Sequence, residues 1–401
     1  MRNWWSVYAA MPANIWVLFF TLALVMTAVP LMVLVSGLIG AELAPTPNLA
    51  TLPLACVVIG TALMTLPAAF VVRLKGRRFG GFLGIACAFA GALAGVASTE
   101  LASFGFLLLG SVLMGVGMAF FQQFRFAAIE SLRNPADAGP AVSLIMFSGI
   151  VSALIGPELG VWGLQWPGFA NYSGSFVILA GLVLTAAVVY SRFSNPLGTQ
   201  GDDGGSVRPL GEIVCQPVFL VAVAAAAIGY GVMSFLMTST PISMHVLHGH
   251  ALGEAKWVIQ SHLLAMFMPS LFSGVLLRLF GAGKLMLAGC ALYLAVLLIA
   301  TAGHEVVHYW WALVLLGIGW NFLFLAGTTL LPAAYRGAER FKTQAVNDFS
   351  VFAIQAAASL SAGWVLYRFG WALQVWSCLV PVLALLLVSA FYGWSRSGRS
   401  A

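Results

Sequence analysis

Long apolar runs separated by short polar stretches dominate the chain. Runs of about 20 apolar residues can cross roughly 30 Å of hydrocarbon at 1.5 Å per residue. Such runs begin near Asn14, Thr51, Phe79, Leu101, Ala141, Ser173, Val214, Trp257, Lys284, Val307, Val346 and Trp371. The pattern predicts an all-α integral membrane protein with twelve spans. We interpret the first run, residues 15–40, as a retained helix because it is too long for the apolar core of a signal peptide.

The longest polar stretch divides the chain into two halves. Residues 191–209, with Gly and Asp at 201–205, predict a flexible cytoplasmic linker between a six-helix bundle at 1–190 and a second at 210–401. The halves echo each other at an offset of just over 200 residues. The repeated pairs are Arg73-Leu74-x-Gly76 with Arg278-Leu279-x-Gly281, and Gly115-x-Gly117 with Gly317-x-Gly319. Two echoes at nearly one offset indicate parallel six-helix repeats.

Composition and charge support a membrane protein and exclude most soluble functions. Charged residues make up 7% of the chain, against roughly 25% in soluble domains. If the N-terminus is cytoplasmic, every Lys and Arg except Lys256 and Arg368 lies on the cytoplasmic side, which favours cytoplasmic termini. The net charge of +6 then faces membrane lipid, and we expect no nucleic acid partner. Enzyme motifs and Cys-x-x-Cys pairs are absent, so we expect neither catalysis nor a zinc ribbon.

Span eight carries the strongest candidate for chemistry. An ionisable side chain in hydrocarbon costs about 2.5 kcal/mol or more, and His262 is the only histidine predicted within a span. Met266 follows it by four residues, and Met233 and Met237 have the same spacing on span seven. Because spans seven and eight form an antiparallel hairpin, these four side chains could meet in the outer half of the membrane.

Three thioethers and one imidazole form a soft, neutral ligand set. This set favours Cu(I), bound weakly enough to leave again, over Mg, Ca or Mn. Packing is the alternative, because Met often fills helix interfaces and Met114 and Met118 show the same spacing without a histidine. The motif therefore predicts a transported copper ion and no resident cofactor.

Other polar residues have weaker functional interpretations. The predicted outer loop holds Met244, His245, His248 and His250, which could capture metal, although we favour an ordinary exposed polar loop. Glu158 in span five could couple transport to protons or serve as a structural acid. Arg125 with Glu130, and Asn347 with Asp348, lie at predicted cytoplasmic span ends, where we expect gate or helix-packing contacts.

The motifs resemble a known family. The loops at Gly76 and Gly281 resemble the Gly-x-x-x-Asp-Arg-x-Gly signature of the major facilitator superfamily, with Arg73 and Arg278 in place of the aspartate. The Met233-x-x-x-Met237 and His262-x-x-x-Met266 pairs resemble those of CcoA-like copper importers, a bacterial branch of that superfamily. Further similar stretches, which mark the branch and not the substrate, are 125–128, 320–331 and 344–349.

The resemblance implies copper import across the bacterial inner membrane by alternating access, chiefly to supply a cbb3-type cytochrome oxidase. Met233, Met237, His262 and Met266 would be the ligands, and a copper chaperone or oxidase assembly factor would be a partner of the monomer. One alternative is an organic-solute porter of the same fold, for example for riboflavin, in which aromatic cavity residues and Glu158 matter more than the methionines. Another is a non-transporting membrane protein that hands metal to an assembly factor.

Overall fold

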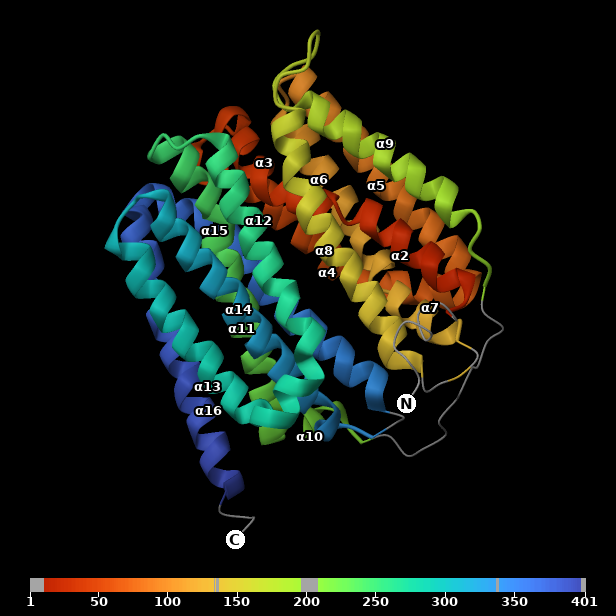
Figure 1. Cartoon of the computed structure of the whole chain (residues 1–401), viewed down its shortest axis with the longest axis vertical. Coiled ribbons are helices and arrows are strands. Elements are labelled where there is room, and N and C mark those ends of the chain that lie inside the picture. Colours follow the sequence, from red (N-terminus) through yellow and green to blue (C-terminus); the bar gives the residue numbers. More distant parts are fainter. Residues whose placement is uncertain (1–10, 133, 135–136, 196–207, 337–338, 398–401) are drawn as a thin grey trace. The chain divides into compact units, whose positions relative to one another are not determined.

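The chain folds into two compact helical units. A computed structural model describes residues 11–132, 134, 137–195, 208–336 and 339–397, and all regular structure within them is helical. Unit 1 comprises Met1–Pro45 and Leu52–Gln200, and unit 2 comprises Thr46–Thr51 and Gly201–Ala401 (Figure 1). Most of the predicted linker, residues 196–207, lies outside the described residues.

Unit 1 contains the first six predicted spans. Its helices are α2 (Ala13–Val25), α3 (Ala28–Leu43), α4 (Leu52–Lys75), α5 (Arg77–Glu100), α6 (Phe104–Phe121), α7 (Phe124–Glu130), α8 (Ala138–Trp162) and α9 (Ser173–Tyr190). The first span is divided into α2 and α3 just before Pro30, which has no N–H to continue the helical hydrogen bonds. Figure 1 shows α5 running beside α9, and the two helices are in contact.

Unit 2 contains the other six predicted spans. Its helical segments are η1 (Pro47–Leu49), α10 (Leu210–Val214), α11 (Pro217–Pro241), the π-helical turn η3 (Ile242–Leu247), α12 (Leu252–Phe267), η4 (Met268–Phe272), α13 (Ser273–Ala302), α14 (Val306–Leu330), η5 (Leu331–Ala334), α15 (Arg340–Ser377) and α16 (Leu379–Ser397). Within this unit α13 and α16 run side by side (Figure 1).

Ten helices of the described residues are long and apolar enough to cross a membrane. One of them, the 51-residue stretch Lys342–Tyr392, holds two predicted spans separated at Gly370, where φ is +80°. The predicted eighth span begins as α12, which has 16 residues, or about 24 Å at 1.5 Å per residue. The helical path continues through η4 and the start of α13 until Gly281, where φ is +70° and ψ is 163°. One departure from a simple count of helices therefore occurs at Gly370, and the other occurs where α12 ends at the 3-10 turn η4.

The two halves repeat each other in backbone geometry. Gly76 joins the second and third spans of unit 1 with φ +88° and ψ 163°, close to the values at Gly281 in the matching junction of unit 2. These left-handed conformations suit glycine because it has no Cβ. The echo around Arg73 and Arg278 thus corresponds to one shared turn.

The second echo lies in the fourth membrane span of each half, which is α6 in unit 1 and α14 in unit 2. A Cβ on Gly115 of α6 would lie 2.1 Å from the Val57 carbonyl oxygen of α4, and one on Gly117 would lie 2.8 Å from the Gly84 oxygen of α5. In α14, Gly317 approaches α12 in the same way, and Gly319 approaches α13. In each unit the fourth span therefore packs its backbone directly against the second and third spans.

An ion pair joins the residues just before α10 to those just before α15. Arg208 donates from Nε and Nη2 to the two carboxylate oxygens of Glu339 at 2.8 and 2.6 Å, and its Nη2 also donates to the Ala334 oxygen at 3.0 Å. The Glu339 side chain is fully buried. Hydrogen bonds from Arg208 outweigh the effect of burial and hold the pKa of Glu339 well below its ordinary value. In unit 1, Arg77 forms a similar two-bond pair with Glu130.

We predict that Gly115→Ala destabilises the protein by about 1–3 kcal/mol, the usual cost of overpacking, because α4 and α6 must move apart. Gly317→Ala should act in the same way on α12 and α14. The control is Gly181→Ala, because nothing lies within 4 Å of a Cβ there. Thermal unfolding in detergent measures the effect, and equal midpoints for all three variants would exclude the proposed close packing.

We also predict that Glu339→Gln lowers the unfolding temperature at pH 7. A carboxyl whose pKa is lowered by folding contributes stability above its unfolded pKa of about 4.3, and that contribution is lost as the pH falls toward the folded pKa. The gap between wild type and variant should therefore shrink as the pH is lowered from 5 to 3. Glu305→Gln, at an exposed position before α14, is the control. A gap that does not depend on pH would contradict the ion-pair assignment.

Candidate functional site

The four predicted metal ligands are all buried within unit 2. Met233 and Met237 lie on α11, and His262 and Met266 lie on α12. None is more than 6% exposed. However, α11 packs mainly on α14 and α15, whereas α12 packs mainly on α14. The hairpin expected to unite the four side chains is therefore organised around a third helix.

His262 makes its hydrogen bond to that third helix. Its Nδ1 donates to the Leu313 carbonyl oxygen of α14 at 2.7 Å, because a carbonyl can only accept. One turn further along α14, the absence of a side chain at Gly317 brings the two backbones together. The imidazole thus connects spans eight and ten one turn from this close approach, and its Nε2 is buried without a hydrogen-bond partner among the described residues.

The imidazoles of the histidine-rich loop of unit 2 are hydrogen-bonded to backbone oxygens. Nδ1 of His245 donates to the His250 oxygen, Nδ1 of His248 donates to the Ser243 oxygen and Nε2 of His250 donates to the His304 oxygen, each at 2.7 Å. A nitrogen that donates in this way has no lone pair for a metal. Met244 is fully buried, and the described residues contain no group of three or more His, Cys, Asp or Glu placed to hold a metal ion.

The imidazoles of His248 and His304 are stacked. The His248 and His304 ring centroids lie 4.1 Å apart with the planes 16° from parallel, and His250 Nδ1 lies 3.7 Å from the Glu254 carboxylate. Burial and the neighbouring His248, His308 and His250 lower the pKa of His304. The surroundings therefore favour a neutral His304 ring in the stack.

Aromatic side chains from three helices meet near the middle of unit 2. Tyr230 of α11 lies 5.0 Å from Trp320 and 5.5 Å from Phe324 of α14, nearly perpendicular to both, with distances measured between ring centroids. Trp320 and Phe324 stack at 5.2 Å with an interplanar angle of 6°, and Phe352 of α15 lies 6.5 Å from Tyr230. We call Tyr230, Trp320, Phe324 and Phe352 the aromatic cluster.

Local sequence fixes the position of Tyr230 in the cluster. It lies between two glycines, and a Cβ on Gly229 would meet Leu323 of α14 at 3.1 Å, whereas one on Gly231 would meet Ile354 of α15 at 2.9 Å. Tyr293 also donates from its hydroxyl to the Gly229 oxygen at 2.7 Å. Helix α11 therefore approaches both neighbours closely where it carries the tyrosine ring.

The cluster combines exposed ring surface with a buried donor. Tyr230, Phe324 and Phe352 are partly exposed, whereas Trp320 is 5% exposed. The indole Nε1 of Trp320 is buried and has no hydrogen-bond acceptor among the described residues. Stacking surface and a directed N–H in one place suit a flat ring with an acceptor atom at its edge.

None of the remaining predicted residues is a member of the aromatic cluster. Glu158 is partly buried on α8, directly after Pro157. Arg125 is exposed, with its guanidinium carbon 4.8 Å from the Phe126 ring centroid, and Glu130 pairs with Arg77. Asp348 accepts a hydrogen bond from Asn347 Nδ2 at 3.0 Å. Their predicted coupling or gating roles remain predictions.

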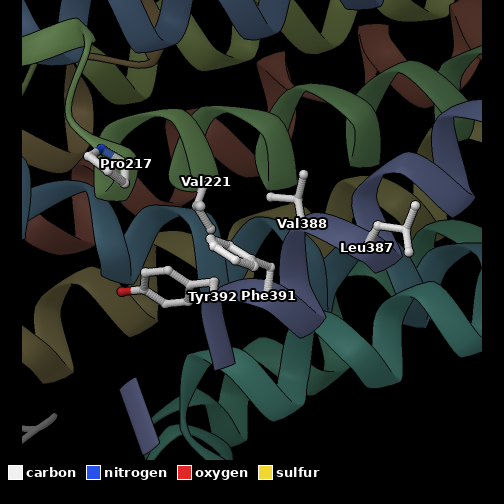
Figure 2. A pocket seen from close by; sticks show the side chains of 6 residues that line it. All are labelled: Pro217, Val221, Leu387, Val388, Phe391 and Tyr392. Atoms are coloured by element: carbon white, nitrogen blue, oxygen red, sulfur yellow. The ribbon is translucent and has the colours of Figure 1, made fainter. Parts of the chain in front are cut away.

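A pocket of about 320 Å³ lies between α11 and α16 and is almost entirely apolar. Figure 2 shows Phe391 and Tyr392 of α16 close to Pro217 and Val221 of α11. Phe391 is 69% exposed, as expected of a side chain that faces lipid. The pocket lacks the converging polar groups of a solute site.

Sequence patterns gave only a partial signal for the aromatic cluster. Trp320 and Phe324 are four residues apart, which places them on one face of a helix, but they also lie in the stretch 320–331 that resembles the copper-importing branch. Tyr230 and Phe352 are single aromatics in apolar runs, and nothing in their spacing distinguishes them from packing residues.

Comparisons of the sequence and of the structure with known proteins agree on the fold. The profile of the Major Facilitator Superfamily matches residues 14–252. The riboflavin transporter RfnT of Brucella anthropi is 39% identical over 97% of each chain, and the uncharacterized MFS-type transporter YddS of Bacillus subtilis is 28% identical over 90% of this chain and 86% of its own. A bacterial homologue of the human lysosomal transporter Spinster, solved in an inward-facing occupied conformation, superposes with a TM-score of 0.68 at 19% identity over 96% of both chains.

These findings confirm the predicted transporter fold and the prediction that the chain is not an enzyme. The prediction of copper import is wrong, because the relative that matches nearly the whole chain at 39% identity is a riboflavin transporter. The resemblance to the copper-importing branch rested on residues that are buried at helix interfaces in the structure. In particular, His262 makes its hydrogen bond to Leu313.

We predict that acidification loosens the histidine stack of unit 2. The lowered pKa of His304 means that its contribution to stability is present above the unfolded value of about 6.5 and is lost as the pH falls through the folded value. His304→Phe keeps a flat ring on His248 without a titrating group. Between pH 7.5 and 5, the wild-type melting temperature should fall more than that of this variant. A fall of equal size in both proteins would contradict the assignment.

Proposed function

Because the chain belongs to the major facilitator superfamily, we propose that it is a secondary transporter of an organic solute with a flat aromatic ring system, with riboflavin as the first candidate. The observation that carries the proposal is the 39% identity to a riboflavin transporter over 97% of both chains. The aromatic cluster adds support from the side chains, because stacking on Tyr, Trp and Phe favours planar rings.

The surroundings of the transporter are part of the proposal. The distribution of Lys and Arg favours a multi-pass protein of the bacterial inner membrane with both termini in the cytoplasm. In that orientation the histidine-rich loop faces outward, because span seven starts on the cytoplasmic side. We further propose a monomer surrounded by membrane lipid, without a resident cofactor.

Uptake by cells tests the proposal. Bacteria that cannot make riboflavin and lack their own transporter should accumulate radiolabelled riboflavin when they express the chain, and cells with empty vector should not. Cell copper, measured in the same cultures by mass spectrometry, should be equal in both. Riboflavin uptake no higher than with vector, at confirmed membrane abundance, would rule out riboflavin as the solute.

A methionine variant separates the proposal from a metal-based mechanism. Met233→Leu with Met237→Leu preserves apolar volume, and such swaps usually cost less than about 1.5 kcal/mol of stability. The double variant should therefore retain more than about half of wild-type riboflavin uptake. Loss of uptake with unchanged abundance would show that the thioethers matter to transport.

A further inference from the structure

The aromatic cluster has a buried hydrogen-bond donor without an acceptor. Trp320 is 95% buried, and its indole N–H has no partner among the described residues. Most buried polar groups in proteins are hydrogen-bonded, and an unpaired group is costly where no water replaces the missing partner. Nearby, Tyr293 donates to the Gly229 oxygen and the Asn321 amide nitrogen donates to the Met266 oxygen, while Asn321 Oδ1 is likewise buried without a partner among the described residues.

The rings around this donor present two orientations of aromatic surface. Trp320 and Phe324 are almost parallel, and Tyr230 stands nearly at right angles to both. Aromatic rings favour offset stacking and edge-to-face contacts, so a flat ligand can stack on one surface while its edge meets the other. The four side chains of the cluster carry no formal charge.

The geometry points to the aromatic cluster as the binding site for the ring system of the solute, with Trp320 Nε1 donating a hydrogen bond to a carbonyl oxygen or ring nitrogen at the ring's edge. The inference rests on the proposed function and deepens it. It assigns recognition to the heteroaromatic ring and not to the flexible polyol chain that riboflavin also carries.

The chemistry of the cluster distinguishes this ligand class from others. A polyol or sugar needs many hydrogen-bonding groups, and only two of the four side chains in the cluster, Trp320 and Tyr230, carry such a group at all. An anionic solute needs a cation, which none of the four side chains provides. A tricyclic flavin combines a broad apolar face with acceptors along one edge, and both features have a counterpart in the cluster.

Close helix packing and a backbone hydrogen bond hold Tyr230 in place. Gly229 and Gly231 hold α11 close to α14 and α15, and the Tyr293 hydroxyl donates to the backbone between them. Side chains locked by packing lose little freedom on binding, which increases affinity. Tyr230 is therefore held in place before the solute arrives, whereas the Trp320 N–H, which is buried in this conformation, must become accessible for the solute to accept its hydrogen bond.

Binding to the purified full-length protein in detergent tests the inference. Riboflavin loses fluorescence when its ring stacks on tryptophan or tyrosine, so titration gives a dissociation constant. Trp320→Phe keeps a flat ring and removes the N–H, and it should weaken binding about tenfold. Trp364→Phe is the matched control, since Trp364 is 49% exposed on α15 and contacts Phe369 outside the cluster. It should bind like wild type.

Competing ligands test which part of the solute is recognised. Lumiflavin, which has the ring system without the polyol chain, should displace riboflavin from wild type. Ribitol, which has the polyol chain without the ring, should not. Phe324→Leu keeps the donor and removes stacking surface, so it should weaken lumiflavin and riboflavin binding by similar factors. Monodisperse elution on size exclusion confirms that each variant is folded.

Each outcome has a distinct meaning. If wild type binds riboflavin and Trp320→Phe binds it equally well, the assignment of the donor fails while the proposed function stands. If ribitol competes and lumiflavin does not, the ring is not the recognised part and the inference is overturned. If wild type binds no flavin and takes up none in cells, the proposed function fails and the inference fails with it.

Discussion

Close contact between helix backbones at glycine is the constraint on which both six-helix units depend. In a membrane the hydrophobic effect does not drive helices together, so small residues that permit tight packing become decisive. Gly115 and Gly117 seat α6 against α4 and α5, and Gly317 and Gly319 seat α14 against α12 and α13. The fourth span of each unit is thereby packed tightly against two others. Side chains on this span are therefore carried by a rigid backbone.

Rigid packing determines which polar groups serve the fold and which remain for function. The His262 imidazole and the Asn321 amide each donate to a backbone carbonyl of a neighbouring helix, so they help hold α12 against α14. The Trp320 indole has no such partner among the described residues. The aromatic cluster therefore combines an unpaired donor with partly exposed rings, whereas the His262 imidazole already bonds through Nδ1 to the helix beside it.

The fold could be predicted from sequence in most respects because it follows from span length and glycine placement. The twelve apolar runs correspond to the helical path, and the repeated glycines around Gly76 and Gly281 occupy matching turns. The helix counts differ because Gly370 bends a continuous helix and because α12 ends after 16 residues at η4, and a hydropathy pattern registers neither feature.

The site could not be predicted in the same way. Four-residue spacing places Met233 with Met237 and His262 with Met266 on helix faces, but spacing does not say which neighbour a face meets. Helix α11 packs mainly on α15 and α14, and α12 packs mainly on α14. Tyr230, Trp320 and Phe352 come from three helices far apart in sequence, so only tertiary packing brings them together. The glycines that flank Tyr230 were the one local hint of close packing there.

The most direct measurement is riboflavin counterflow in vesicles reconstituted with the purified protein. Vesicles loaded with unlabelled riboflavin are diluted into a trace of labelled riboflavin, and entry of label is followed over time. A carrier that alternates access exchanges the two pools, so label should rise well above its equilibrium level and then decline. The account predicts this overshoot in loaded vesicles and not in vesicles loaded with buffer or copper. Label entry equal to that in protein-free vesicles would contradict it.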